Sequence, residues 1–172
     1  MANDTKTKSG RHEAREAVFT LLFETEYHDG EAPETILARA AEDREFDAAD
    51  KYITATYLGV MQHLPELDAL IGKYAKGWKT GRLSRVSRAV LRLGTYEMTF
   101  GGVPAPVAIN EAVELFKKFD DPESKTKSFV NGVLNAVKDA VKDGFPADLM
   151  PAAEPAEESA EESAAETPAD DE

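Results

Sequence analysis

The sequence contains no cysteine among its 172 residues. This absence excludes disulfide bonds, thiolate metal sites and a cysteine nucleophile. The chain also lacks any run of about 18 consecutive apolar residues, which argues against a membrane-spanning helix. No apolar segment follows the first residues, so we expect no secretory signal peptide. We therefore expect a cytoplasmic protein that makes no membrane contact.

Residues arranged for catalysis are also scarce. The segment 12–15 begins like the zinc motif HExxH but lacks the second histidine that a zinc site requires. Residues 77–81 resemble a phosphate-binding loop, yet Arg82 and Leu83 stand where that loop needs Lys and Ser or Thr. We expect no catalytic residue, no metal site and no cofactor, and therefore no enzymatic activity.

The net charge of −13 is concentrated at the C-terminus. Residues 151–172 carry nine acids and no base, so residues 1–150 hold 20 basic and 24 acidic side chains. This tail has no large apolar side chain to compensate the entropy of ordering. We predict a flexible N-terminus over residues 1–10, one domain over residues 11–145 and a disordered acidic tail over residues 146–172. Such a tail either solubilises the protein or competes with nucleic acid for its basic surface.

Apolar residues recur at helical spacing throughout the predicted domain, and no segment alternates like a β-strand. Pro33 is expected in the first turn of the second helix, Asp47 as the cap of the third, and Ser84 as the start of a later long helix. Residues 77–81 separate two halves. The sequence thus predicts an all-α, compact bundle of about seven helices in two subdomains. The buried stripe of the first helix is expected to comprise Ala14, Ala17, Val18, Leu21 and Leu22.

Two segments combine basic and aromatic residues, a combination typical of single-stranded nucleic-acid binding. Cations hold the phosphates while flat rings stack on unpaired bases. The first segment places Arg15, Phe19 and Phe23 four residues apart, along one helical stripe, with Arg11 one turn earlier. The second segment contains Lys117, Lys118, Phe119, Lys125, Lys127 and Phe129. Rings at helical spacing are also typical of a buried core, so the pattern alone leaves both interpretations open.

Several motifs resemble those of a known family. Residues 11–16, with Arg11, Ala14, Arg15 and Glu16, followed by Leu22-Phe23, resemble the arginine-bearing first helix of the NusB transcription antitermination family. The resemblance continues in order with Arg88-Ala-Val-Leu-Arg92-Leu, Tyr96-Glu97, Val103-Pro104, Val107-x-Ile109-Asn110-Glu111-Ala-Val-Glu114-Leu115 and Phe129-Val-Asn131-Gly-Val-Leu134. It spans residues 11–142. The chain departs from the family pattern at His12, Thr20 and Ser87, where the family commonly has arginine, glutamine and an acid.

The resemblance implies a helical, NusB-like fold and a role without catalysis. It implies binding of single-stranded boxA RNA jointly with a small-subunit ribosomal protein, NusE. The pair would join an RNA polymerase complex with NusA and NusG during ribosomal RNA transcription. By this analogy the expected RNA contacts are Arg11, Arg15, Phe23, Lys118, Phe119, Lys127 and Phe129. The expected contacts with the protein partner are Ser87, Arg88 and Arg92.

Two other interpretations stay open at this point. The chain could be a homodimeric protein-interaction module whose RNA face is covered, since some relatives are dimeric. It could also resemble the accessory RNA-binding domain of RNA methyltransferases, although no cofactor-binding region follows. Asn110, Glu111 and Asn131 are expected to satisfy backbone groups at helix ends rather than to contact RNA.

Overall fold

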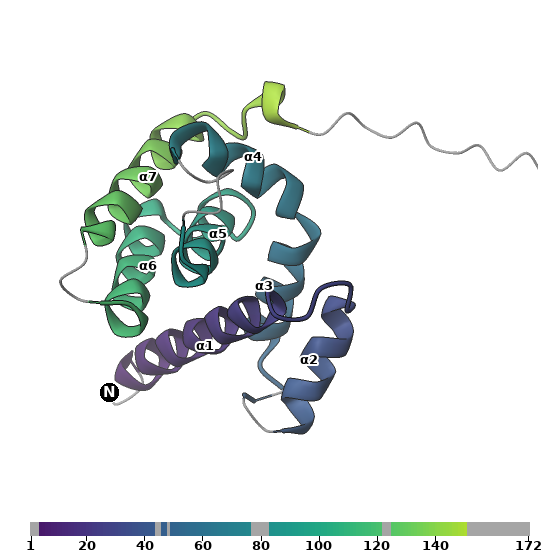
Figure 1. Ribbon diagram of the computed structural model, residues 1–172. Coiled ribbons are helices and arrows are strands. Elements are labelled where there is room, and N and C mark those ends of the chain that lie inside the picture. The colour runs from purple at the N-terminus through teal and green to yellow at the C-terminus, as the bar shows by residue number, and fades with distance from the viewer. Residues whose placement is uncertain (1–3, 44–45, 48, 77–82, 122–124, 151–172) are drawn as a thin grey trace, which may run out of the picture.

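The computed structural model describes residues 4–43, 46–47, 49–76, 83–121 and 125–150. Within these ranges the chain forms seven α-helices, one short 3₁₀ helix over Ala147–Leu149 and no strand (Figure 1). The all-α prediction is confirmed. The expected break at 77–81 and the acidic residues 151–172 lie outside the described residues. The α-helices are α1 (Asp4–Thr25), α2 (Pro33–Glu42), α3 (Lys51–Gln62), α4 (Leu64–Tyr74), α5 (Arg85–Thr99), α6 (Ala105–Phe119) and α7 (Thr126–Ala140).

Local capping interactions fix where several helices begin. The Ser84 hydroxyl accepts a hydrogen bond from the backbone N–H of Ser87 at 3.1 Å, as expected for an N-cap of α5. Pro33 occupies the first turn of α2, as predicted. The prediction for α3 is wrong by three residues: Asp50, not Asp47, accepts from the first backbone N–H groups of that helix. The Asp47 carboxylate is already engaged by the N–H of Ala49 at 2.9 Å.

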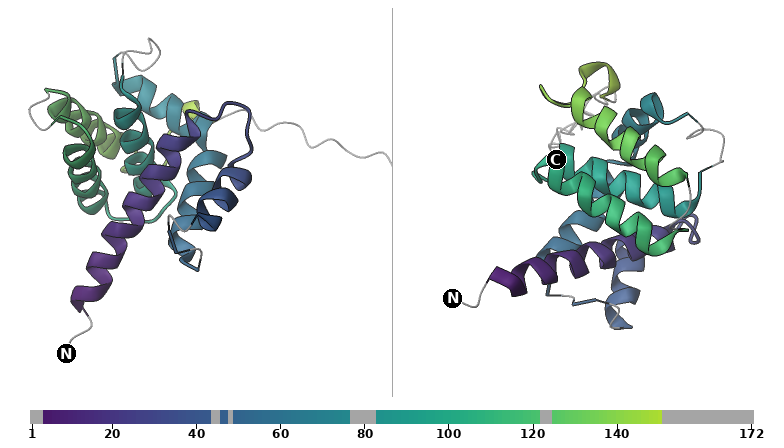
Figure 2. Two further views of the ribbon diagram at one scale, coloured as in Figure 1. Left: turned by 60° about the horizontal axis from the view of Figure 1, so that its bottom comes forward. Right: turned by 90° about the vertical axis from the view of Figure 1, so that its left-hand side faces the viewer.

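Helix α1 begins at Asp4, inside the segment that we expected to be flexible. The left view of Figure 2 shows the N-terminal part of α1 extending beyond the other helices. The first helix therefore carries its N-terminal residues away from the bundle instead of ending against it.

The helices form two groups joined through α1 and α5. Helices α1, α2 and α3 pack together, as do α4, α5, α6 and α7, while α1 also contacts α5 and α6 (Figures 1 and 2). At Gly94 of α5, an added Cβ would lie 3.1 Å from Leu134 of α7 and 3.2 Å from Ala112 of α6, so these side chains would have to shift by a few tenths of an ångström to admit it. The fully buried aliphatic core includes Val18, Leu21, Ile36, Val60, Leu67, Leu70, Ile71, Val90, Leu91, Leu93, Leu115, Val130, Leu134 and Val137.

Candidate nucleic-acid interface

The fold brings the two predicted basic and aromatic segments into contact. Phe119, the last residue of α6, stacks on Phe19 of α1, with ring centroids 4.6 Å apart and planes inclined by 23°. Phe19 is buried, whereas 41% of Phe119 is exposed. One ring thus anchors the other while leaving part of it open to solvent, which is the arrangement that base stacking requires.

One basic side chain lies beside this ring pair, and a second lies farther along α1. Lys118 lies with its ammonium 5.6 Å from the Phe119 ring centroid and forms an ion pair with Glu16 across the α1–α6 boundary. Arg11 is exposed on α1, about two turns before Phe19. Its guanidinium carbon lies 4.0 Å from the centroid of the Tyr52 ring. Lys118 thus lies where α1 meets α6, whereas Arg11 lies nearer the N-terminus of α1, over Tyr52 of α3.

His12 of α1 is held by two acids. His12 contacts Glu111 at 2.7 Å and Glu16 at 3.4 Å, so the imidazole lies between two carboxylates. Asn110 and Asn131 are exposed in the interior of α6 and α7, so they do not satisfy helix ends as we expected. Glu111 does have a structural role, but through a side chain of α1 and not through a helix terminus.

The start of α7 adds further residues from the predicted set. Lys125 is exposed, while Lys127 and Phe129 are half-buried. Phe129 packs against the hydrophobic core, and the next residue, Val130, is fully buried. Residues 122–124, between α6 and α7, lie outside the described residues. Of the two C-terminal rings, Phe119 is therefore the more accessible for a ligand.

Arg15 differs from its expected role. Only 6% of this residue is exposed. Its Nε donates to both carboxylate oxygens of Glu97, at 3.0 and 3.1 Å, and Glu97 is itself 2% exposed. Burial by itself lowers the pKa of Arg15, but attraction and hydrogen bonding to Glu97 outweigh it and raise the pKa above its usual value. The expectation of direct RNA contact is corrected: Arg15 is an internal cation that ties α1 to α5.

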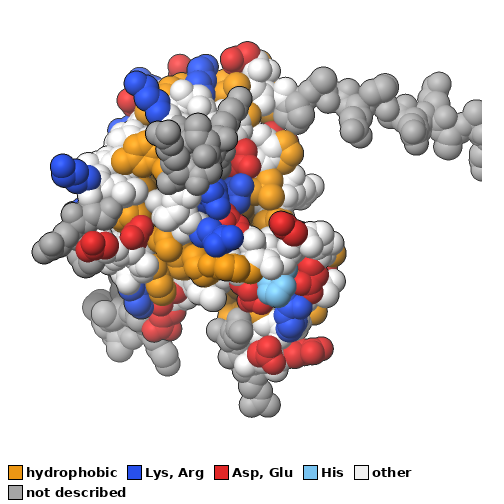
Figure 3. Space-filling view, in the orientation of Figure 1, with side chains coloured by type: hydrophobic (Ala, Val, Ile, Leu, Met, Phe, Trp, Pro, Cys, Tyr) orange, Lys and Arg blue, Asp and Glu red, His pale blue; other side chains and the backbone are white. Residues whose placement is uncertain are grey.

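A row of rings continues along α1 from Phe119. Phe19 lies 6.1 Å from Phe23, and Phe23 lies 5.4 Å from Tyr27, measured between ring centroids. Tyr27 is 56% exposed, and the guanidinium carbon of Arg85 lies 4.2 Å from its ring centroid. Figure 3 shows a band of hydrophobic side chains on the face seen in Figure 1, bordered by basic and acidic groups. This aromatic row leads from the α6 end toward α5.

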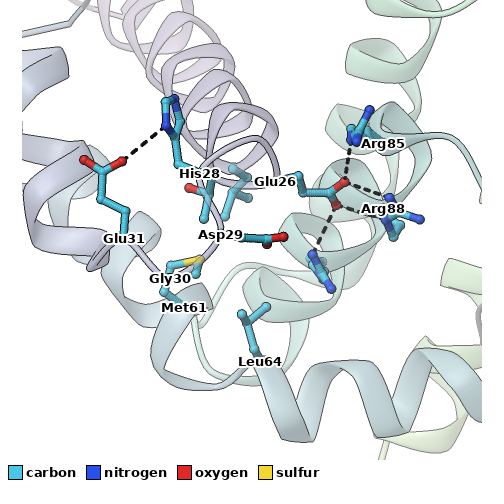
Figure 4. A pocket seen from close by; sticks show the side chains of 12 residues that line it. Glu26, His28, Asp29, Gly30, Glu31, Met61, Leu64, Arg85 and Arg88 are labelled. Atoms are coloured by element: carbon cyan, nitrogen blue, oxygen red, sulfur yellow. Dashed lines mark hydrogen bonds and ion pairs between the residues drawn. The ribbon is translucent and has the colours of Figure 1, made fainter. Parts of the chain in front are cut away.

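The second predicted site lies at the α5 end of that row. Arg88 donates from Nη2 to Glu26 at 2.8 Å, Arg92 lies 3.3 Å and Arg85 3.5 Å from the same carboxylate (Figure 4). Arg92 also pairs with Asp68 at 2.9 Å. Sequence reasoning missed Glu26 because its partners are 62 and 66 residues away.

Beside this cluster is a pocket of about 430 Å³. Arg88 and Arg92 line it together with Leu22, Met61 and Leu64. Ser87, in contrast, is fully buried, and its backbone and hydroxyl contact the hydroxyl of Ser84. The expectation that Ser87 contacts a partner directly is corrected, because Ser87 lies on the buried face of α5, whereas its neighbour Arg88 lines the pocket.

In the described part of the chain, no three His, Asp or Glu side chains form a group that could hold a metal ion. No helix in the same ranges is long and apolar enough to cross a membrane.

Comparison with known proteins identifies relatives over most of the domain. The model of the NusB family matches residues 12–139. The transcription antitermination protein NusB of Agathobacter rectalis is 42% identical over 127 residues, which is 72% of this chain and 95% of that protein. The protein of the same name from Desulforamulus reducens is 37% identical over 129 residues, or 73% of this chain and 87% of that protein.

Solved structures agree with this relationship. A structure of T. maritima NusB superposes with a TM-score of 0.66 at 34% identity, covering 81% of this chain and 95% of that one. A structure of the antitermination factors NusB and NusE in complex with dsRNA gives a TM-score of 0.66 at 30% identity, covering 76% of this chain and 96% of that one.

Proposed function

Because this chain belongs to the NusB family, we propose that it is a transcription antitermination factor that binds boxA RNA jointly with the small-subunit ribosomal protein NusE. In this proposal the pair joins an RNA polymerase complex with NusA and NusG during ribosomal RNA transcription in the cytoplasm. The related complex that contains NusB, NusE and dsRNA supports RNA and NusE as partners. The role is that of an adaptor, which binds and places its partners without a chemical step.

The observation that carries the proposal is the Phe119–Phe19 stack with Lys118 beside it, together with the exposed Arg11 about two turns before Phe19 on α1. Segments 100 residues apart in the chain meet there, and the outer ring is 41% exposed. An unpaired base stacked on such a ring contributes about 1–3 kcal/mol of binding free energy. Arg11, Lys118 and Lys127 then supply phosphate contacts. The half-buried Phe23 and Phe129 add apolar surface at the edges.

Acidic residues limit the strength of these phosphate contacts. Lys118 is paired with Glu16 in the free protein, so RNA has to replace that partner. Each phosphate contact made to a single strand contributes about −0.7 to the slope of log affinity against log salt concentration. With two or three cations, we expect weak binding that depends strongly on salt, and a second partner that strengthens it.

We assign the protein partner to the pocket beside Glu26. Arg88 and Arg92 border it, and Leu22, Met61 and Leu64 provide apolar surface. The ring row from Phe119 to Tyr27 joins this pocket to the RNA surface. Partners on adjoining surfaces can contact each other, and binding of either one then favours the other by the same factor.

The test is a titration of fluorescent boxA-type RNA and of a scrambled RNA, with and without the ribosomal protein, at two salt concentrations. We expect preference for the boxA type, a steep loss of affinity at the higher salt, and tighter binding with the ribosomal protein. Equal, weak binding of both RNAs would contradict the proposal. Measurement of the mass in solution completes the test, because a stable dimer that ignores RNA would favour the homodimeric interaction module.

A further inference from the structure

A buried polar network lies directly beneath the exposed Arg11. Glu97 of α5 accepts hydrogen bonds from Arg15 of α1 and from the hydroxyl of Tyr52 at the start of α3. The three side chains come from three helices, and both charged ones are nearly inaccessible to solvent. The network therefore fixes the phenol ring of Tyr52 relative to α1.

The hydroxyl of Tyr52 is held in its protonated form. Burial raises the pKa of this group, and the adjacent negative charge of Glu97 and their hydrogen bond raise it further. The neutral hydroxyl therefore donates to Glu97 around neutral pH. This hydrogen bond favours one orientation of the ring.

Two guanidinium groups face that ring. The guanidinium carbon of Arg11 is 4.0 Å from the ring centroid, and that of Arg15 is 5.8 Å away. Arg15 and Arg11 are four residues apart on α1, so they lie on one face of the helix. Arg15 forms a buried ion pair with Glu97, whereas Arg11 is exposed to solvent.

Stacking on a ring uses the flat face of a guanidinium and leaves its N–H groups, which point outward in the plane, available. Those N–H groups can donate to two oxygens of one phosphate at once. A long side chain that is already held in place loses less freedom when it binds. The contact with Tyr52 thus prepares Arg11 for a phosphate without occupying its donors.

We propose that Tyr52 is a positioning residue for RNA binding, which holds Arg11 through its ring while its own hydroxyl is anchored on Glu97. The inference deepens the proposed function and rests on it. In this proposal Tyr52 itself makes no RNA contact. The internal Arg15–Glu97 pair supports the exposed Arg11 indirectly, because Glu97 also holds the hydroxyl of Tyr52.

The experiment is a double-mutant cycle with fluorescent boxA-type RNA at low salt. Tyr52→Leu removes the ring, Arg11→Ala removes the cation, and the double variant combines them. We expect Tyr52→Leu to weaken binding by about 2- to 5-fold, the range of an exposed cation–π contact. The same substitution is expected to have no further effect in the Arg11→Ala background. Tyr52→Phe, which keeps the ring, is expected to retain most of the affinity.

Two controls separate positioning from a general loss of structure. Tyr57→Phe removes a buried hydroxyl on the same helix, bonded to Thr25 at 2.7 Å, and is expected to leave RNA affinity unchanged. The NMR signal of the Arg11 side-chain N–H should carry a ring-current shift that Tyr52→Leu abolishes and Tyr52→Phe preserves. This second readout needs no RNA and remains valid if Tyr52→Leu lowers stability.

The outcomes are distinct. Additive effects of Tyr52→Leu and Arg11→Ala on RNA affinity, with wild-type binding intact, would overturn the positioning role and leave the proposed function standing. The absence of the ring-current shift in the wild type would also overturn it. A wild-type protein that binds no RNA would overturn the proposed function and this inference with it.

Discussion

Replacing Glu97 with glutamine tests the buried ion pair between α1 and α5. The glutamine has nearly the same shape but no charge, so Arg15 would stay buried without its counter-ion. Removal of one partner from a buried pair costs about 3–5 kcal/mol of the free energy of unfolding. Glu111 lies 3.9 Å from Arg15 Nη1 and is 21% exposed, so it offers partial compensation. We therefore expect a loss near the lower limit, about 3 kcal/mol.

Glu114→Gln is the matched control. Glu114 pairs with Lys117 at 2.8 Å, but these side chains are 48% and 39% exposed. Exposed pairs contribute about 0–1 kcal/mol, so the same chemical change should have little effect at this position. The comparison isolates burial of the pair as the variable.

The assay is urea unfolding of both variants at neutral pH, followed by circular dichroism. With a urea dependence of about 2 kcal/mol per molar, Glu97→Gln should lower the midpoint by roughly 1.5 M. The control should shift it by less than about 0.5 M. Equal shifts in the two variants would refute the reasoning, because the Arg15–Glu97 pair would then contribute no more than a surface pair.

Phe119→Ala should weaken RNA binding by about 1–3 kcal/mol while helix content stays constant, and a loss of circular dichroism signal would instead identify the ring as essential core. Glu16→Gln should strengthen binding at low salt by about 2- to 5-fold, because it releases Lys118, and Glu13→Gln, which removes the same charge from the same helix, should have a smaller effect. Burial raises the pKa of Tyr52, Tyr57 and Tyr96, so their phenols should ionise later in the native protein than in urea, as followed by ultraviolet absorbance. Since the folded state disfavours their charged form, they contribute stability that is complete below the unfolded value of about 10 and is lost as the pH rises above it; coincident native and unfolded titrations would contradict this. Deletion of residues 151–172 should leave the helix content unchanged and, if the acidic tail competes with RNA, should tighten RNA binding; unchanged affinity would reject that competition.

The helices themselves follow from local sequence. Apolar spacing places Val18, Leu21 and Leu22 on one face of α1, and all three are buried. Capping by Ser84 and the first-turn Pro33 are equally local, and were predicted correctly. Such features depend on residues within one helical turn, so a single sequence contains the information that they need.

The exposure of individual site residues depends on distant segments. Helical spacing correctly grouped Arg15, Phe19 and Phe23, but it could not show that α5 and α6 cover the first two. The partner of Arg15 is 82 residues away. A stripe of rings with an arginine is compatible with an open surface or a covered one, and only tertiary packing decides between them. Glu26 escaped prediction for the same reason, because three arginines of α5 define its role.

The most direct test of the account is to map the RNA-binding surface by NMR during titration with single-stranded boxA-type RNA. The account predicts that the signals of Arg11, Lys118 and Phe119 shift together, with smaller changes at the start of α7. It predicts little change at Arg88 and Arg92 until the ribosomal protein is added. Shifts confined to the pocket beside Glu26, or none at the Phe119 ring, would contradict RNA binding at the junction of α1 and α6.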